Sequence, residues 1–288
     1  MDIALSSLVS MGFDASDASA ALEVCGGSAE RAVEMILSGG VGGVGNVGDA
    51  GIDPRGGLVG NNGTPPTLVE CSLSQYSTPG GRSACTCVAL EAANSFLSLA
   101  SQQANTQGAA ESLLTPSFLS DALAAGGKIY SDIPREGAVE HMSAEEVLTN
   151  CPEFVSLRLL GAVRQGVLSS DLSSPLGFRA QIEGCLEDDS ADRNQWTAIL
   201  ITKAPETVVC VIPPLNLGGS GRGYTLIDSH PRPQLGIQGA YAAIHANLWD
   251  LLQSLGCTFP PTNLDPDMGD IMAMMINSFD IYALQRKK

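Results

Sequence analysis

The sequence predicts an α+β protein in which a small helical domain precedes a larger domain of helices followed by an antiparallel sheet. Three observations support this prediction. Apolar residues recur at helical spacing within residues 1–40, glycine dominates residues 41–66, and strand-like runs of valine, isoleucine and threonine appear after about residue 196. We therefore expect a first domain at 1–40, a linker at 41–66 and a second domain at 67–288.

Residues 1–40 predict three short helices joined by two tight loops. Asp14 can cap the second helix, Gly26-Gly27 ends it, and Ser28 can cap the third. This order resembles a ubiquitin-associated (UBA) domain, which implies binding of ubiquitin or polyubiquitin chains. The alternative is that the same residues only pack a small core. The resemblance places the binding residues in the first loop and at the exposed end of the third helix: Met11, Gly12, Phe13, Ile36 and Leu37.

The glycine-rich segment 41–66 has no hydrophobic period, and glycine makes an ordered conformation costly, so we expect a flexible linker. In the second domain, the spacing of apolar and turn residues predicts the remaining elements. Helices are expected at about 84–100, 116–125, 143–148 and 154–163. Strands are expected at 67–73, 196–202, 207–212, 224–228 and 279–284. A late amphipathic helix is expected to carry Tyr241, Ile244, Leu248, Leu251 and Leu255 and to end at Gly256.

A glycine turn at Gly80-Gly81 precedes the helix expected at 84–100 and places Cys85 in the first turn of that helix. Ser83 can act as the N-cap, which leaves Cys85 among the free N–H groups at the positive end of the helix dipole. That environment favours the thiolate, which is the nucleophilic form of cysteine. The alternative is that Cys85 is a small apolar residue on the buried stripe of the helix.

A cysteine nucleophile needs a base, usually an imidazole oriented by a third group, and the chain has only three histidines. His230 follows the strand 224–228, and Asp228 lies two residues before it, so both side chains are expected on one face. Asp228 would orient the ring and leave its other nitrogen to face a thiol. The alternative for Asp228 is an ordinary turn in which the carboxylate caps local N–H groups. The alternative bases are His141, before a Ser-x-x-Glu capping box, and His245, beside the late helix.

Gln75 lies in the loop that leads to the cysteine helix. Acyl transfer needs hydrogen-bond donors aimed at the developing oxyanion, and the Gln75 amide together with the Cys85 N–H would supply them. The alternative is a solvated loop glutamine without a catalytic role.

A glutamine and a cysteine in a loop-to-helix connection, followed later by a histidine on a sheet, resemble the papain-like cysteine proteases. The order Asp228-Ser229-His230 is similar to that in the deubiquitinases of herpesvirus large tegument proteins and their cellular relatives, where the aspartate precedes the histidine by two. The resemblance implies a papain-like second domain and a cysteine-type deubiquitinase. It implies Cys85 as nucleophile, with Gln75 at the oxyanion.

Cys87 is the alternative nucleophile. The run from Thr86 to Ala92 also looks like the cysteine of papain and the short apolar run that follows it. Two other functions remain open. One is a non-catalytic ubiquitin-binding adaptor, and the other is a papain-fold enzyme, for instance a protease for another ubiquitin-like modifier.

Composition excludes several classes of function. A formal net charge of −16 should repel phosphate backbones, so we expect no nucleic-acid binding. The eight cysteines form no Cys-x-x-Cys pair with a nearby histidine, so no metal or other cofactor is expected. We find no membrane-spanning apolar run and no signal-peptide pattern. We therefore expect a thiol-reduced intracellular protein, in the cytoplasm, the nucleus or both.

Overall fold

The computed structural model describes residues 15–24, 65–78, 81, 83–102, 108–134, 141–217, 223–262 and 269–288. The chain divides into two compact units, Met1–Ile52 and Asp53–Lys288. In the first unit, helix α2 (Ala15–Val24) buries Ala18 and Leu22, which confirms the helix predicted after Asp14. The other two predicted helices and most of the predicted linker lie outside the described residues, as do the predicted ubiquitin-binding residues Met11, Gly12, Phe13, Ile36 and Leu37.

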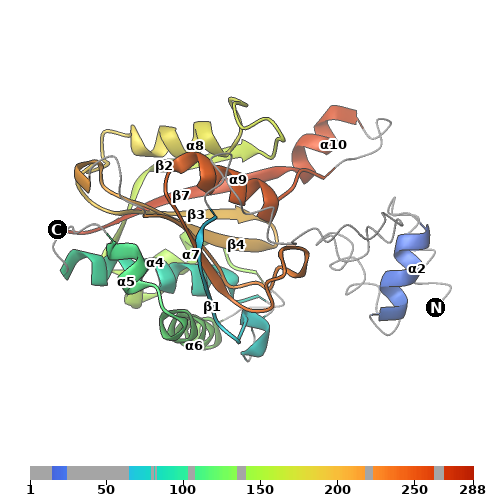
Figure 1. Ribbon diagram of the computed structural model, residues 1–288, viewed down its shortest axis with the longest axis horizontal. Helices are drawn as coiled ribbons and strands as arrows, with labels where there is room; N and C mark the ends of the chain where they lie inside the picture. The colour runs from blue at the N-terminus through green and yellow to red at the C-terminus, as the bar shows by residue number, and fades with distance from the viewer. Residues whose placement is uncertain are drawn as a thin grey trace. The chain divides into compact units, whose positions relative to one another are not determined.

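The second unit is built on an antiparallel sheet of seven strands in the order β1-β6-β5-β4-β3-β7-β2 (Figure 1). Its strands are β1 (Thr67–Glu70), β2 (Leu157–Val167), β3 (Thr197–Lys203), β4 (Glu206–Ile212), β5 (Tyr224–Asp228), β6 (Tyr241–His245) and β7 (Ser278–Arg286). The helices and this sheet confirm the predicted α+β class. Five of these strands coincide with the predicted ones at 67–73, 196–202, 207–212, 224–228 and 279–284.

Helices cover both faces of the sheet (Figure 1). One face carries α4 (Cys85–Gln102), α5 (Ala109–Leu113), α6 (Pro116–Asp132) and α7 (Ala144–Asn150), and the other carries α8 (Phe178–Leu186) and α9 (Leu248–Thr258). A further helix, α10 (Gly269–Ile276), precedes β7. The helices predicted at 84–100, 116–125 and 143–148 are confirmed as α4, α6 and α7, whereas α5, α8 and α10 were not predicted.

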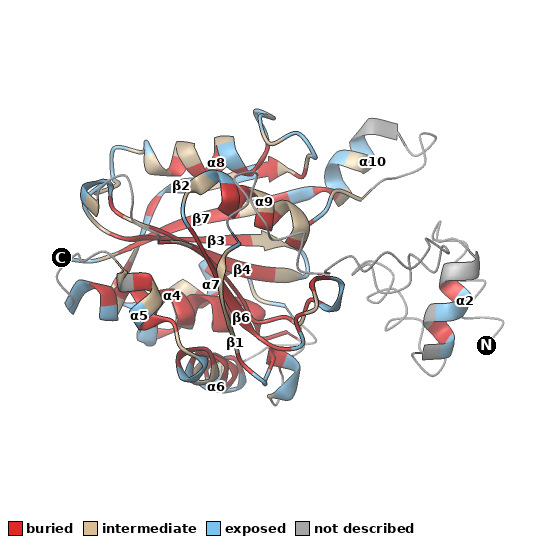
Figure 2. Cartoon of the chain, in the orientation of Figure 1, coloured by how far each residue is buried: buried red, intermediate tan, exposed pale blue. Residues whose placement is uncertain are grey.

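Alternating side chains of the central strands divide the core into two layers. Along β3, Ala198 and Leu200 pack in the core beneath α4, while Ile199 and Ile201 pack in the core beneath α8 and α9. Figure 2 shows that the central strands and the inner side of α4 are buried. The helix that carries Cys85 therefore packs on the central strands of one face of the sheet.

A close helix contact fixes the start of α4. Gly126 of α6 lies so near Val88 that a Cβ atom placed on it would come within 2.5 Å of the Val88 Cα. Only glycine allows α6 to approach α4 at this point without a shift of one helix. The first turn of α4 is thus held between α6 and the sheet.

The helix predicted at 154–163 is wrong, because this segment forms most of strand β2. Gly161 has φ of +58°, which no right-handed helix contains, and the β2–β7 pairing shifts register between Leu160 and Arg164. The pairing satisfies backbone groups along nearly the whole of β7. That long-range pairing outweighs the local helical spacing.

The late helix predicted from Tyr241 to Gly256 is also wrong in its first part and at its end. Tyr241–His245 forms β6, which lies between β1 and β5, and only Leu248–Thr258 is helical, capped by Asn247. Because β6 is buried on both faces, its residues do not alternate between apolar and polar. Gly256 lies inside α9 and does not end it.

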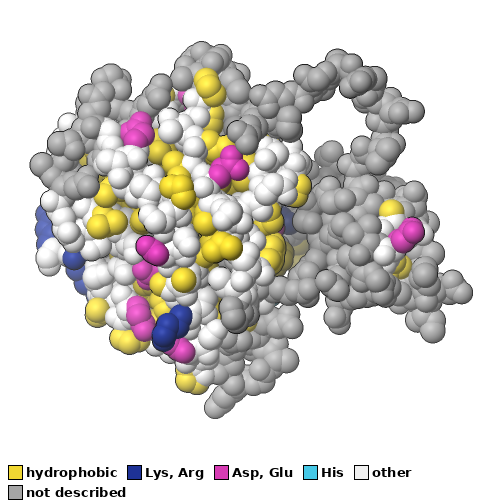
Figure 3. Space-filling view, turned by 60° about the horizontal axis from the view of Figure 1, so that its bottom comes forward, with side chains coloured by type: hydrophobic (Ala, Val, Ile, Leu, Met, Phe, Trp, Pro, Cys, Tyr) yellow, Lys and Arg dark blue, Asp and Glu magenta, His cyan; other side chains and the backbone are white. Residues whose placement is uncertain are grey.

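Charged side chains are dispersed on the face of the molecule that Figure 3 shows. Some acidic side chains are scattered there among uncharged and apolar ones, and others lie near a basic side chain at the lower left of the view. Among the described residues, no helix is long and apolar enough to cross a membrane.

Candidate active site

Cys85 is the first residue of α4 and only 2% of it is exposed. The predicted N-cap at Ser83 is therefore one residue too early, since Ala84 directly precedes the helix. The predicted helix start near Ala84 is otherwise confirmed, and the N–H of Cys85 has no acceptor within the helix at this position. In its protonated form the thiol donates to the carbonyl oxygen of Pro205, 3.4 Å away, in the turn between β3 and β4.

Cys87 lies in a different environment from Cys85. It is 1% exposed and belongs to the hydrophobic core between α4 and the sheet, whereas Cys85 belongs to neither core cluster. The two cysteines thus differ in their surroundings: Cys87 packs with apolar neighbours, and Cys85 contacts a polar group.

Asp228 and His230 lie together at the end of β5. The ring nitrogen Nδ1 of His230 is 2.7 Å from Asp228 Oδ1, and the backbone N–H of His230 donates to the same oxygen at 2.9 Å. The strand ends at Asp228, so the contact arises from a bend after the strand and not from strand alternation as predicted. The carboxylate both caps a local N–H and orients the ring.

Arg232, which the sequence analysis did not single out, completes the surroundings of Asp228. Its Nε donates to Asp228 Oδ2 at 2.7 Å, and its Nη2 lies 2.7 Å from Glu206 Oε2 at the start of β4. The guanidinium also lies over the Phe259 ring at 5.5 Å from the centroid. A buried carboxylate needs a cationic partner, and an arginine four residues after Asp228 was the available signal.

Gln75 lies in a short 3-10 helix, Gln75–Ser77, and is 1% exposed. Ser229 Oγ donates to Gln75 Oε1 at 2.9 Å, and the Gln75 backbone N–H donates to the Ser229 carbonyl oxygen at 3.0 Å. The Gln75 amide nitrogen Nε2 is buried without a hydrogen-bond partner among the described residues. The Gln75 side chain is thus held through its oxygen Oε1, and its amide nitrogen Nε2 remains available as a donor.

The electrostatics of the site favour an ion pair between Cys85 and His230. Burial raises the pKa of Cys85, but hydrogen bonds with His141 and His230, the His230 charge and the Thr207 backbone N–H together lower it to about 6. Burial lowers the pKa of His230, but the charge and hydrogen bond of Asp228, followed by Cys85, raise it to about 10. The thiolate and imidazolium are therefore the favoured forms at neutral pH.

Asp228 remains ionised although it is completely buried. Burial raises the pKa of its carboxyl group, but the charges of Arg232 and His230 lower it to about 2. The carboxylate accepts from His230 on one oxygen and from Arg232 on the other. It can therefore hold the imidazole in one orientation throughout the neutral pH range.

The other two histidines differ in burial. His141 is exposed and lies just before α7, and it is one of the groups that lower the pKa of Cys85. His245 is a buried residue of β6, 2% exposed, and not the predicted boundary residue beside a helix. Burial lowers the pKa of His245 to about 4, and its Nε2 has no hydrogen-bond partner in the described part of the chain.

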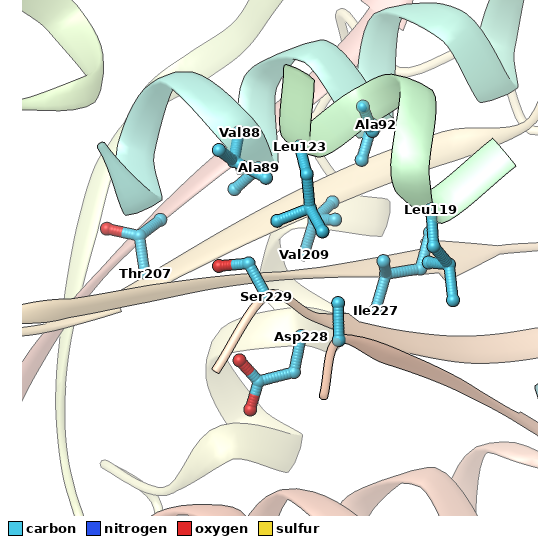
Figure 4. Close-up of a pocket in the computed structure, with 12 residues that line it drawn as sticks. Val88, Ala89, Ala92, Leu119, Leu123, Thr207, Val209, Ile227, Asp228 and Ser229 are labelled. Atoms are coloured by element: carbon cyan, nitrogen blue, oxygen red, sulfur yellow. The ribbon is translucent and has the colours of Figure 1, made fainter. Parts of the chain in front are cut away.

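A narrow, mostly apolar pocket lies behind the site, between α4, α6 and the sheet. In Figure 4, the Asp228 carboxylate points away from the apolar side chains of Val88 and Leu123, which line this pocket. On the outer side, Tyr76 is 53% exposed, and its ring meets the His230 ring edge-on at 6.1 Å between centroids. Tyr76 therefore forms an exposed rim beside the buried imidazole.

Within the described residues, no group of three or more histidine, cysteine, aspartate and glutamate side chains could hold a metal ion. All the cysteines described are free thiols. The chemistry that this arrangement allows is nucleophilic attack by a thiolate, with an imidazole to carry the proton.

Comparison with known families identifies one segment of the chain. Residues 4–36 match the UBA/TS-N domain family. The matched span contains Met11, Gly12, Phe13 and Ile36 and ends one residue before Leu37. The UBA domain predicted at the N-terminus is thus confirmed, and it indicates ubiquitin binding. No curated protein matches the chain.

Proposed function

We propose that the protein is a deubiquitinating cysteine hydrolase, which cleaves peptide or isopeptide bonds at the C-terminus of ubiquitin. One observation carries the proposal: Cys85, His230, Asp228 and a partnerless Gln75 amide meet in a chain that also has a UBA domain. The resemblance to papain-like proteases supports hydrolysis by a thiol as the reaction, and the UBA domain supports ubiquitin as the modifier. We further propose that the enzyme acts in the cytoplasm, the nucleus or both.

In the proposed reaction, the Cys85 thiolate attacks the carbonyl carbon of the terminal ubiquitin residue. The negative charge that develops on the carbonyl oxygen is stabilised by the Gln75 Nε2 and the Cys85 N–H. His230 then gives its proton to the departing amine as the carbon–nitrogen bond breaks, which leaves a thioester. A water molecule gives a proton to His230 and attacks the thioester, which releases the ubiquitin carboxylate and regenerates the thiolate with the imidazolium.

The UBA domain would act through effective concentration. By binding one ubiquitin of a chain, it would hold the others near the second unit, with no additional contact at the active site. Deletion of the UBA domain should therefore weaken cleavage of polyubiquitin more than cleavage of a single ubiquitin with a small leaving group.

The deciding experiment uses ubiquitin that carries a thiol-reactive electrophile at its C-terminus. Wild type, Cys85→Ala, Cys87→Ala and His230→Ala are incubated with this probe and read by intact mass. We expect an adduct with wild type and Cys87→Ala and none with Cys85→Ala. Loss of the adduct only in Cys87→Ala would keep the class of enzyme and move the nucleophile to Cys87.

A specific observation favours the non-catalytic adaptor as the second candidate. Cys85 is 2% exposed, and its thiol donates to the Pro205 carbonyl oxygen. If the adaptor function holds, the folded wild type binds ubiquitin but forms no adduct with the probe. An adduct with an analogous probe for another ubiquitin-like modifier, and none with ubiquitin, would keep the chemistry and change the modifier.

A further inference from the structure

Ser229 lies between Asp228 and His230, and it contacts Gln75 twice. Ser229 Oγ donates to Gln75 Oε1 at 2.9 Å, and the Ser229 carbonyl oxygen accepts from the Gln75 backbone N–H at 3.0 Å. Ser229 is 7% exposed and Gln75 is 1% exposed, so both hydrogen bonds are shielded from water. The bend after β5 thus holds the His230 ring through Asp228 and holds Gln75 through the next residue.

The backbone of Gln75 is fixed on both sides. Its N–H donates to Ser229, and its carbonyl oxygen accepts from the N–H and the hydroxyl group of Thr78, at 3.1 and 2.8 Å. A Cβ atom on Gly81 would overlap the same carbonyl oxygen, so the chain packs closely here. The freedom that remains to Gln75 is therefore that of its side chain, which among the described residues is hydrogen-bonded by the Ser229 hydroxyl group alone.

The Ser229 hydroxyl group also determines which end of the Gln75 amide stays free. In the observed orientation, the hydroxyl hydrogen is bound by Oε1, and Nε2 is the group without a partner. If the amide is turned over, Nε2 donates to the hydroxyl oxygen. Oε1 and the hydroxyl hydrogen then both lose their partner, because Ser229 Oγ makes no other hydrogen bond within the described part of the chain. Buried polar groups without partners are costly, so the orientation with a free Nε2 is favoured.

We propose that Ser229 is a positioning residue, which holds the Gln75 amide so that Nε2 is the group presented to the carbonyl oxygen of the substrate. This inference rests on the proposed function, because it gives Ser229 a part in stabilising the oxyanion. Ser229 acts through Gln75 and not on the reacting atoms. The segment Asp228-Ser229-His230 then positions the base and the oxyanion donor together, and its middle residue needs a hydroxyl group.

The first test is a double-mutant cycle on the cleavage of ubiquitin that carries a small leaving group. Wild type, Ser229→Ala, Gln75→Ala and the double variant are compared by kcat, and thermal unfolding checks that each is folded. Ser229→Thr keeps the hydroxyl group and adds a methyl group beside the narrow pocket that Ser229 lines. The matched control is Ser254→Ala in α9, which also removes a buried serine hydroxyl, one that has no hydrogen-bond partner among the described residues.

We expect Ser229→Ala to lower kcat by about 10-fold, the effect of losing one neutral hydrogen bond. Ser229→Thr should restore most of this loss, and Ser254→Ala should leave kcat unchanged. In the Gln75→Ala background, Ser229→Ala should have no further effect, because the amide that it positions is gone. A further fall of kcat in the double variant overturns the proposal, and so does an unchanged kcat in Ser229→Ala.

Alkylation of Cys85 by iodoacetamide separates positioning from support of the fold. It is read by intact mass across pH, with Cys85→Ala as the blank for other thiols. This reaction forms no oxyanion, so its rate and its pH midpoint should be the same in wild type and in Ser229→Ala. An equal loss of alkylation and of ubiquitin cleavage in Ser229→Ala would show that Ser229 supports the bend as a whole, which rejects the positioning role.

NMR of isotope-labelled protein tests the inference without ubiquitin. The side-chain amide signals of Gln75 are assigned by their absence in Gln75→Ala, and their nitrogen relaxation measures how rigidly the amide is held. We expect a rigid amide in wild type and Ser229→Thr and a mobile one in Ser229→Ala, whereas an amide that stays rigid in Ser229→Ala overturns the proposal. If the amide becomes mobile as expected but wild type cleaves no ubiquitin, the proposed function fails and the positioning of Gln75 by Ser229 stands.

Discussion

Arg232 and His230 share the Asp228 carboxylate, one on each oxygen, at 2.7 Å each. Arg232 therefore compensates the negative charge of Asp228, which also holds His230. Both the arginine and the histidine are buried. A further ion pair joins Arg232 to Glu206, so the imidazole, two carboxylates and a guanidinium form one connected chain. Each change in this chain has a consequence that can be measured.

Arg232→Gln should be strongly destabilising. It leaves the buried Asp228 carboxylate without its cation, and breaking a buried pair by removing one partner costs about 3 kcal/mol or more. Urea unfolding at neutral pH measures the loss. Arg179→Gln removes the same kind of side chain from an exposed pair with Glu183 and should cost less than about 1 kcal/mol. Equal losses in the two variants would contradict the structural role of Arg232.

Glu206→Gln should lower the pKa of His230, because the Glu206 charge is one of the groups that raise it. The active pair needs an ionised Cys85 and a protonated His230, so activity should be bell-shaped in pH between about 6 and about 10. In the variant, the fall of activity on the alkaline side should move to lower pH. The rate of adduct formation with the ubiquitin probe, measured across pH, checks this, with the exposed Glu183→Gln as control. An alkaline limb that stays in place or moves upward contradicts the assignment.

Gln75→Ala should reduce kcat for ubiquitin cleavage by about 10²–10³-fold, the effect of removing one oxyanion donor. Alkylation of Cys85 by iodoacetamide has no oxyanion and should keep its rate. Steady-state kinetics and alkylation on the same sample separate the two effects. If both rates fall together, Gln75 supports the fold of the site and not the oxyanion.

His245 should make the fold sensitive to acid. Its pKa is lowered by burial from 6.5 to about 4, so the unfolded chain binds a proton first as the pH falls. The stability that this neutral histidine contributes is present above pH 6.5 and is lost as the pH falls towards about 4. The loss is on the order of 3 kcal/mol, from about 1.4 kcal/mol per pKa unit. Urea unfolding of wild type and His245→Gln between pH 7 and pH 4.5 checks this prediction, and parallel pH profiles would contradict it.

The sequence predicted the local parts of the site better than the distant ones. Cys85 at a helix start and the Asp228-His230 pair depend on neighbouring residues, and the structure shows both. Arg232 was not predicted although it lies only four residues after Asp228, because the sequence does not show that Asp228 is buried and needs a cation. The sequence offers His141 as an alternative base, but it does not indicate that α7, the helix that follows His141, packs against α4.

The same distinction between local and distant contacts explains which secondary-structure predictions were wrong. The β-branched residues of β3 and β4 predict strands from local sequence alone. The residues of β6 and β2 do not, because Tyr241, Ile244 and Leu248 also fit a helical stripe, and the apolar residues at 154–163 do as well. Their strand conformation depends on pairing with β5, β1 and β7, which local spacing does not reveal.

The end of β5 at Asp228 makes the surroundings of Cys85 depend on the length of one strand. The β4–β5 register, with Val209 opposite Ile227, would place Ser229 opposite Thr207 if the strand continued. Instead, the chain bends, the Ser229 carbonyl oxygen accepts from Gln75, and the Thr207 N–H is left for the Cys85 sulfur. A sheet longer by one residue pair would compete with the sulfur and with Gln75 for the same backbone groups, so the proposed reactivity of Cys85 requires that the ladder stop where it does.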